Sequence, residues 1–97
     1  MSEQVLDRLR VRIDEIDREL LRLLNERMRI SIEVVKAKRP MNKAIFDPPR
    51  EVALLEKLAA LNPGPLSPEG LFNIYKAILE ESRIRQALSS EQKGDTA

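Results

Sequence analysis

The feature that most constrains this 97-residue sequence is a long stretch without a helix breaker, from Gln4 to Lys38. Apolar residues recur along it at alternating spacings of three and four, at Leu6, Leu9, Ile13, Ile16, Leu20 and Leu23 and, after one spacing of seven, at Ile30, Val34 and Ala37. That spacing places them as a stripe along one face of a single α-helix. Because Pro40 lacks a backbone N–H and disfavours a helical conformation at the preceding residue, the helix is predicted to end near Lys38.

The predicted helix is too long for a compact monomer. At 1.5 Å per residue it measures roughly 50 Å, whereas a compact domain of this size has a radius of gyration of about 12.5 Å. The helix must therefore extend beyond any core that one chain can build. Antiparallel pairing with the same helix of a second chain would cover the stripe, so a homodimer is predicted, with a solitary coiled-coil arm as the alternative.

Two shorter helices are predicted to follow. Asp47 precedes two prolines, which is typical of a helix start, and the second helix should span residues 48–61. After the breaker cluster NPGPLSP, Ser67 and a proline should start a third helix that ends near Ser89. We therefore predict an all-α domain over residues 1–90, followed by a flexible polar tail at 91–97. The domain should be a three-helix subunit with one long N-terminal helix, and two such subunits should form an intertwined homodimer.

The composition excludes several classes of function. Seventeen basic and sixteen acidic residues give a net charge of +1, which does not favour binding to nucleic acid or to an anionic membrane. Without Cys or His, the chain lacks thiolate and imidazole metal ligands and the usual general base, so no metal or other cofactor is expected. The N-terminus has no apolar segment typical of a signal peptide, and no run approaches the roughly 18 apolar residues of a membrane span. We therefore expect a cytoplasmic protein.

Several polar residues interrupt the apolar faces of the predicted helices. Arg27 and Lys38 lie in the middle of the long stripe, about 20° apart around the helix axis. The apolar face of the third helix continues, at a spacing of four, into Ser82 and Gln86. Glu51 occupies the first turn of the apolar face of the second helix. These positions place cations, a hydroxyl, an amide and a carboxylate on the inner faces of three helices.

Each interruption has a structural explanation when it is taken alone. The two cations can snorkel or form an interhelical ion pair, Ser82 can bond to its own helix, and Gln86 can be exposed near a helix end. Glu51 in a first turn is favoured by the helix dipole. As a set their charges do not cancel, because the cations outnumber the one carboxylate, Glu51, and burying an unpaired charge is costly. A small, multiply anionic ligand would balance them better, and the arginine fork is suited to binding carboxylates.

The sequence resembles the all-helical (AroQ-type) chorismate mutases over about Leu6–Leu88. The resemblance rests on LRVRIDEIDRELLRLLNERM, VVKAK, FDPPRE and EESRIRQ, which match in order and in spacing. It implies an entwined dimer with two equivalent active sites that take chorismate as the small-molecule substrate. The implied reaction is the concerted Claisen rearrangement of chorismate to prephenate in phenylalanine and tyrosine biosynthesis, with no cofactor and no covalent intermediate.

The resemblance also implies roles for residues that bind the anionic groups of the substrate. Arg10 would reach the site from the long helix of the partner chain and, with Arg27, would hold the substrate carboxylates. Ser82 would lie near the ring carboxylate, and Arg50 would support the anionic end.

The remaining roles concern the reacting atoms. Lys38 and Gln86 would donate hydrogen bonds to the ether oxygen of the breaking bond. Glu51, with the backbone at Asp47, would bind the hydroxyl group of the substrate ring. Pro48 and Pro49 depart from the family pattern and could alter how the neighbouring loop closes, although they remove no side chain of this set.

Two other functions stay open at this point. Related helical dimers eliminate pyruvate from isochorismate in a similar pocket, so an isochorismate-pyruvate lyase is the nearest enzymatic alternative. A non-catalytic dimerisation or regulatory module of the same fold is the other. The sequence also leaves open whether the chain is a monofunctional enzyme or one domain of a bifunctional protein.

Overall fold

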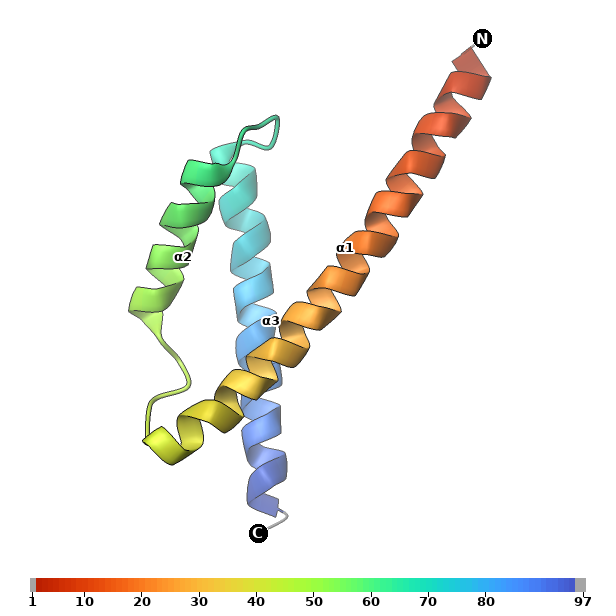
Figure 1. Cartoon of the computed structure of the whole chain (residues 1–97). Helices are drawn as coiled ribbons and strands as arrows, with labels where there is room; N and C mark the ends of the chain where they lie inside the picture. Colours follow the sequence, from red (N-terminus) through yellow and green to blue (C-terminus); the bar gives the residue numbers. More distant parts are fainter. Residues whose placement is uncertain (1, 96–97) are drawn as a thin grey trace.

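A computed structural model describes the backbone of residues 2–95 and the side chains of residues 2–90 (Figure 1). It contains α1 (Ser2–Lys38), a 3-10 turn η1 (Arg39–Met41), α2 (Pro48–Leu61) and α3 (Pro68–Asp95), which confirms the all-α prediction. The predicted end of the third helix near Ser89 was wrong, because the following Glu, Gln and Lys are good helix formers and no proline interrupts them. Of the predicted tail at 91–97, residues 96–97 lie outside the described residues, and the domain boundary at residue 90 stays a prediction.

The residues that predicted the starts of the two shorter helices cap these helices in the structure. Asp47 caps α2, where its Oδ1 accepts a hydrogen bond from the backbone N–H of Arg50 at 3.2 Å. The Ser67 hydroxyl accepts from the backbone N–H of Gly70 at 2.9 Å and caps α3 in the same way. Since both caps satisfy donors that have no intrahelical acceptor, α2 and α3 begin where the sequence predicts.

The three helices form a small body from which one arm projects. In Figure 1, α2 and α3 run antiparallel beside each other, and the C-terminal half of α1 crosses α3 while its N-terminal half extends away. The radius of gyration is 17.7 Å and the longest extent is 62 Å, against about 12.5 Å expected for the radius of a compact domain. The predicted overhang of α1 is therefore confirmed. Within residues 2–95, no helix is both long enough and apolar enough to cross a membrane.

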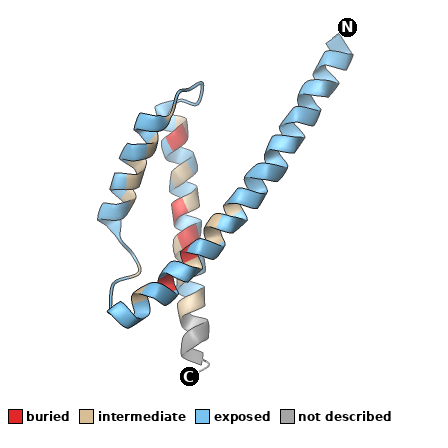
Figure 2. Ribbon diagram, viewed as in Figure 1, coloured by how far each residue is buried: buried red, intermediate tan, exposed pale blue. Residues whose placement is uncertain are grey.

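The core within one chain is small. Among residues 2–90 the buried apolar side chains are Val35, Leu71 and Leu79, and the buried polar side chains are Ser31 and Ser82. Figure 2 shows the buried positions on α3 and on the C-terminal half of α1. The stripe residues of the arm are 44% to 56% exposed in the single chain: Leu6, Leu9, Ile13, Ile16, Leu20 and Leu23. α1 thus buries the face with Ser31 and Val35 inside the chain and leaves the stripe of its arm uncovered, as expected of a surface that needs a partner. The homodimer itself stays a prediction.

Candidate active site

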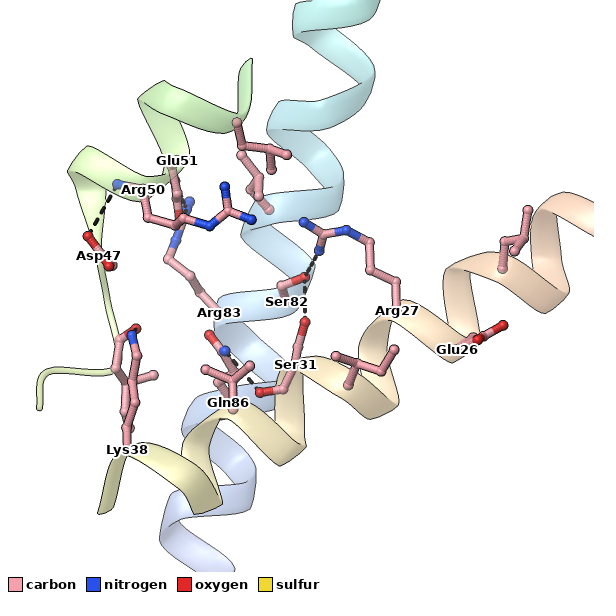
Figure 3. A pocket seen from close by; sticks show the side chains of 16 residues that line it. Glu26, Arg27, Ser31, Lys38, Asp47, Arg50, Glu51, Ser82, Arg83 and Gln86 are labelled. Atoms are coloured by element: carbon pink, nitrogen blue, oxygen red, sulfur yellow. Dashed lines mark hydrogen bonds and ion pairs between the residues drawn. The ribbon is translucent and has the colours of Figure 1, made fainter. Parts of the chain in front are cut away.

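A cavity of about 460 Å³ lies where α1, the loop after it, α2 and α3 meet (Figure 3). Its apolar wall consists of Leu23, Ile30, Val34, Ile45, Leu54 and Leu79. Its polar wall consists of Glu26, Arg27, Ser31, Lys38, Asp47, Arg50, Glu51, Ser82, Arg83 and Gln86. Both the volume and the mixture of an apolar wall with several convergent polar groups are typical of small-molecule sites.

The cavity brings together seven of the eight residues that the sequence nominated: Arg27, Lys38, Asp47, Arg50, Glu51, Ser82 and Gln86. The eighth, Arg10, is exposed on the projecting arm of α1. It precedes Arg27 by 17 residues, or about 25 Å along the helix axis, which is several times the reach of an arginine side chain. Arg10 therefore cannot reach the cavity of its own chain.

Arg27 is held at one end of the cavity by the buried Ser82, which the buried Ser31 contacts in turn. Its Nη1 donates to Ser82 Oγ at 2.8 Å, and the Ser31 hydroxyl donates to the same oxygen at 3.4 Å. Figure 3 shows both bonds, which join α1 to α3. Since a guanidinium has five N–H donors, the bond to Ser82 orients Arg27 and leaves further donors for a ligand. The sequence reasoning missed Ser31, which lies on the α1 face that packs inside the chain.

Lys38 and Gln86 are oriented by backbone carbonyls. Lys38 Nζ donates to the carbonyl oxygens of Ala44 and Ile45, at 3.0 and 3.2 Å, and Gln86 Nε2 donates to the carbonyl oxygen of Ser31 at 3.0 Å. An ammonium has three donors and a side-chain amide has two. Each group therefore keeps one donor beyond its backbone contacts.

Glu51 is paired with a residue that the sequence reasoning missed. Both of its carboxylate oxygens accept from Arg83 Nη1 at 2.8 Å, and the Arg83 guanidinium lies 5.2 Å from the centroid of the Phe46 ring. On α3, Arg83 directly follows Ser82, off the apolar face that drew attention to Ser82 and Gln86. A sequence signal existed in its position three residues before Gln86, since that spacing places two side chains near each other on a helix.

The acid at the far edge of the cavity has a partner on the exposed side of α1. Glu26 accepts from Arg22 Nη1 at 3.0 Å and stands apart from the other labelled acids in Figure 3. Arg22 also bonds Glu19, and that hydrogen bond lowers the pKa of Glu19 and raises the pKa of Arg22. The Glu26 carboxylate is therefore paired with a cation on the exposed side of α1.

The polar wall carries an excess of available positive charge. Glu51 is paired with Arg83, and Asp47 accepts the N–H that begins α2. Arg27 and Lys38, by contrast, donate to neutral oxygen atoms. A ligand with more than one negative charge would match this wall, and fixed donors such as Lys38 and Gln86 can stabilise charge that grows on an oxygen atom.

Comparison with known proteins identifies the family of this arrangement. The family model described as chorismate mutase type II matches residues 9–87. A bifunctional chorismate mutase/prephenate dehydratase of Aquifex aeolicus is 39% identical over 92 residues, covering 91% of this chain and 24% of the relative. The enzyme of the same name from Escherichia coli K12 is 35% identical over 92 residues, covering 94% of this chain and 24% of the relative.

A third relative, from Neisseria gonorrhoeae and also named bifunctional chorismate mutase/prephenate dehydratase, is 39% identical over 69 residues. The chain spans about a quarter or less of the length of these relatives. The family match covers most of the chain, including α1 from residue 9 onward and every residue that lines the cavity. The chain belongs to the chorismate mutase type II family.

Proposed function

We propose that this chain catalyses the rearrangement of chorismate to prephenate, in the cytoplasm and as a step of phenylalanine and tyrosine biosynthesis. The observation that carries the proposal is the cavity itself, which gathers Arg27, Lys38 and Arg50 around an apolar wall in a member of the chorismate mutase type II family. The dehydratase activity in the names of the relatives is not proposed, since the chain spans so small a share of their length.

Binding of the substrate dianion rests on the arginines. In the proposed complex, Arg27 holds a carboxylate through the N–H groups that Ser82 leaves free, and Arg50 supports the anionic end from the first turn of α2. A flexible substrate held by fixed donors on two helices spends more time in the reactive ring conformation. The arginines therefore contribute both affinity and orientation.

The rate would depend chiefly on Lys38 and Gln86. As the carbon–oxygen bond of the ether lengthens, negative charge accumulates on the ether oxygen. One N–H donor from each side chain is available for a hydrogen bond to that oxygen. Both donors are already oriented by backbone carbonyls, so little reorganisation is needed during the reaction. Because these bonds strengthen in the transition state, their loss should lower turnover more than affinity.

The acidic side of the cavity would hold the ring hydroxyl. The pairing of Glu51 with Arg83 leaves lone pairs on both carboxylate oxygens, so Glu51 can accept a hydroxyl donor as well. The backbone at Asp47, next to the first turn of α2, would provide the neighbouring contact.

The proposal includes a homodimer that completes each cavity. Leu23, Ile30 and Val34 line the cavity and also continue the exposed stripe of α1, so a second α1 laid along the stripe would cover the open side. An antiparallel partner would also bring its own Arg10 toward this cavity, which the Arg10 of the same chain cannot reach.

We expect Ile13→Asp to convert the dimer to monomers, because Ile13 lies on the stripe and a buried unpaired carboxylate would be costly there. Gel filtration of the unmodified chain should give twice the 11.1 kDa of one chain, and the variant should elute later. The matched control is Val11→Asp, which is equally exposed in one chain but points about 200° away around the helix. Equal behaviour of the two variants would contradict pairing through the stripe.

The direct test of the function is the ultraviolet loss of chorismate with purified protein. Formation of prephenate supports the proposal, whereas salicylate and pyruvate formed from isochorismate would identify the lyase. Titration with a bicyclic dianionic mimic of the transition state tests the non-catalytic module. Tight binding without turnover would identify that module, and absence of binding would contradict any use of the cavity for this substrate.

Replacing Gln86 by an acid should make the activity depend strongly on pH. The amide donates at any pH, whereas the carboxyl group in Gln86→Glu donates only when it is protonated. Activity of this variant should therefore fall as pH rises through the pKa of that carboxyl group, while the unmodified enzyme changes little. Rates at pH 5 and pH 8 provide the measurement, and equal activity at both would remove Gln86 from the ether oxygen.

A further inference from the structure

Arg83 is a charged residue of the cavity wall to which neither the sequence nor the family resemblance assigns a role. It lies on α3 and reaches Glu51 on α2, with both carboxylate oxygens at 2.8 Å from its Nη1. The two side chains are 37% and 24% exposed, so the pair is partly shielded from water. Such a pair retains more of its attraction than an ion pair on the open surface.

Arg83 also contacts the loop that closes one side of the cavity. Its guanidinium lies 5.2 Å from the centroid of the Phe46 ring, within the range of a cation–π contact. Lys38 holds the preceding part of the same loop through the carbonyls of Ala44 and Ile45. The loop from η1 to α2 is thus attached to α1 by Lys38 and to α3 by Arg83.

We propose that Arg83 is a positioning residue that fixes the Glu51 carboxylate and the Phe46 end of the loop for recognition of the ring hydroxyl. This inference rests on the proposed function, because it names the residue through which Glu51 acts on chorismate. Arg83 needs no contact with the substrate in this role. It keeps the Glu51 carboxylate directed along the wall of the cavity, and the carboxylate lone pairs that Arg83 leaves free accept the hydroxyl.

The geometry predicts which kinetic constant should change. A hydroxyl that stays bound to Glu51 in both the substrate complex and the transition state contributes uniform binding. Loss of uniform binding raises KM and leaves kcat nearly unchanged. A residue that only stabilises the fold would instead reduce the amount of active enzyme and leave KM unaltered.

The test compares Arg83→Met with Arg85→Met in the ultraviolet assay for chorismate. We expect Arg83→Met to raise KM about tenfold with kcat changed less than about threefold, as for the loss of one partly shielded charged hydrogen bond. Arg83→Lys should recover part of the loss, because lysine keeps the charge but not the fork. Arg85 pairs with Glu81 within α3, outside the cavity wall, so its variant should keep the KM of the unmodified enzyme.

A second comparison asks whether Arg83 acts through Glu51. In a Glu51→Ala background, Arg83→Met should change KM less than twofold, whereas independent effects would multiply. Unchanged KM in Arg83→Met, or a full multiplicative effect in the double variant, would overturn the inference. If the unmodified enzyme converts no chorismate, the proposed function fails, and that outcome is distinct because it appears before any variant is compared.

Discussion

Lys38→Ala should reduce the turnover of chorismate by at least 10² to 10³, the effect typical of removing one donor to a developing oxyanion. In the structure the Lys38 ammonium donates to two loop carbonyls and retains a third donor, which is proposed to bind the ether oxygen. Alanine has no ammonium group, so the variant lacks the positive charge that is proposed to stabilise the growing negative charge on the ether oxygen. It also frees the loop, so binding should weaken as well. Steady-state kinetics with prephenate detection measure both effects.

A neighbouring lysine provides the control. Lys36 lies two residues earlier on α1, is exposed and pairs with Glu33 on the same helix at 3.2 Å. Lys36→Ala removes the same charge from the same helix turn without touching the cavity wall. It should keep the kinetic constants of the unmodified enzyme. If Lys38→Ala turned over nearly as fast as the unmodified enzyme, the assignment of Lys38 to the ether oxygen would be wrong.

Two inactive variants should restore activity when they are combined in one dimer. Arg10→Ala lacks the arginine that is proposed to cross the interface, and Lys38→Ala lacks the lysine of the receiving cavity. In a mixed dimer, the cavity with an intact Lys38 faces the partner with an intact Arg10, while the other cavity lacks both. Random pairing makes half of the dimers mixed, and each mixed dimer has one intact cavity of two. An equal mixture should therefore recover about a quarter of the unmodified activity.

The experiment requires exchange of subunits, achieved by co-expression of differently tagged chains or by joint refolding. Each variant alone should stay nearly inactive. Should the isolated mixed dimer stay as inactive as its parents, Arg10 would not act across the interface. Full activity of Arg10→Ala alone would remove Arg10 from the site.

Much of the fold could be predicted because its signals are local. Asp47 before two prolines and Ser67 before one locate the starts of α2 and α3, and the absence of breakers up to Pro40 defines α1. The end of α3 was less predictable, since the polar residues after Ser89 fit a helix as well as a tail. Capping chemistry thus located helix starts better than composition located a helix end.

The division of α1 into two packing faces could not be read from periodicity. The stripe with Ile13 and Leu20 is exposed in one chain, whereas Ser31 and Val35 on the adjacent face are buried against α3. Periodicity identifies which residues seek contact, but it does not say whether the contact lies within the chain or across an interface. The distinction depends on where α3 crosses α1, which is a property of tertiary packing.

Five of the ten polar residues of the cavity wall could be predicted because they interrupt apolar faces, whereas Asp47 and Arg50 were nominated by the family resemblance. Arg27, Ser82 and Gln86 interrupt a regular spacing, and each lines the cavity. Arg83 interrupts nothing, since it lies to one side of the apolar face of α3 and resembles a solvent-exposed arginine. Its contact with Glu51 joins positions 32 residues apart on different helices, and this proximity arises only when α2 and α3 pack together.

The rigid span of α1 between Arg27 and Lys38 sets the distance between the two ends of the cavity. Along the axis the two residues are about 16 Å apart, and nothing in the helix can stretch or fold to absorb a change in length. One inserted residue would rotate one cation by about 100° relative to the other and direct it out of the cavity. During evolution this segment can accept substitutions but not insertions, so differences in chain length among related enzymes should fall in the loops.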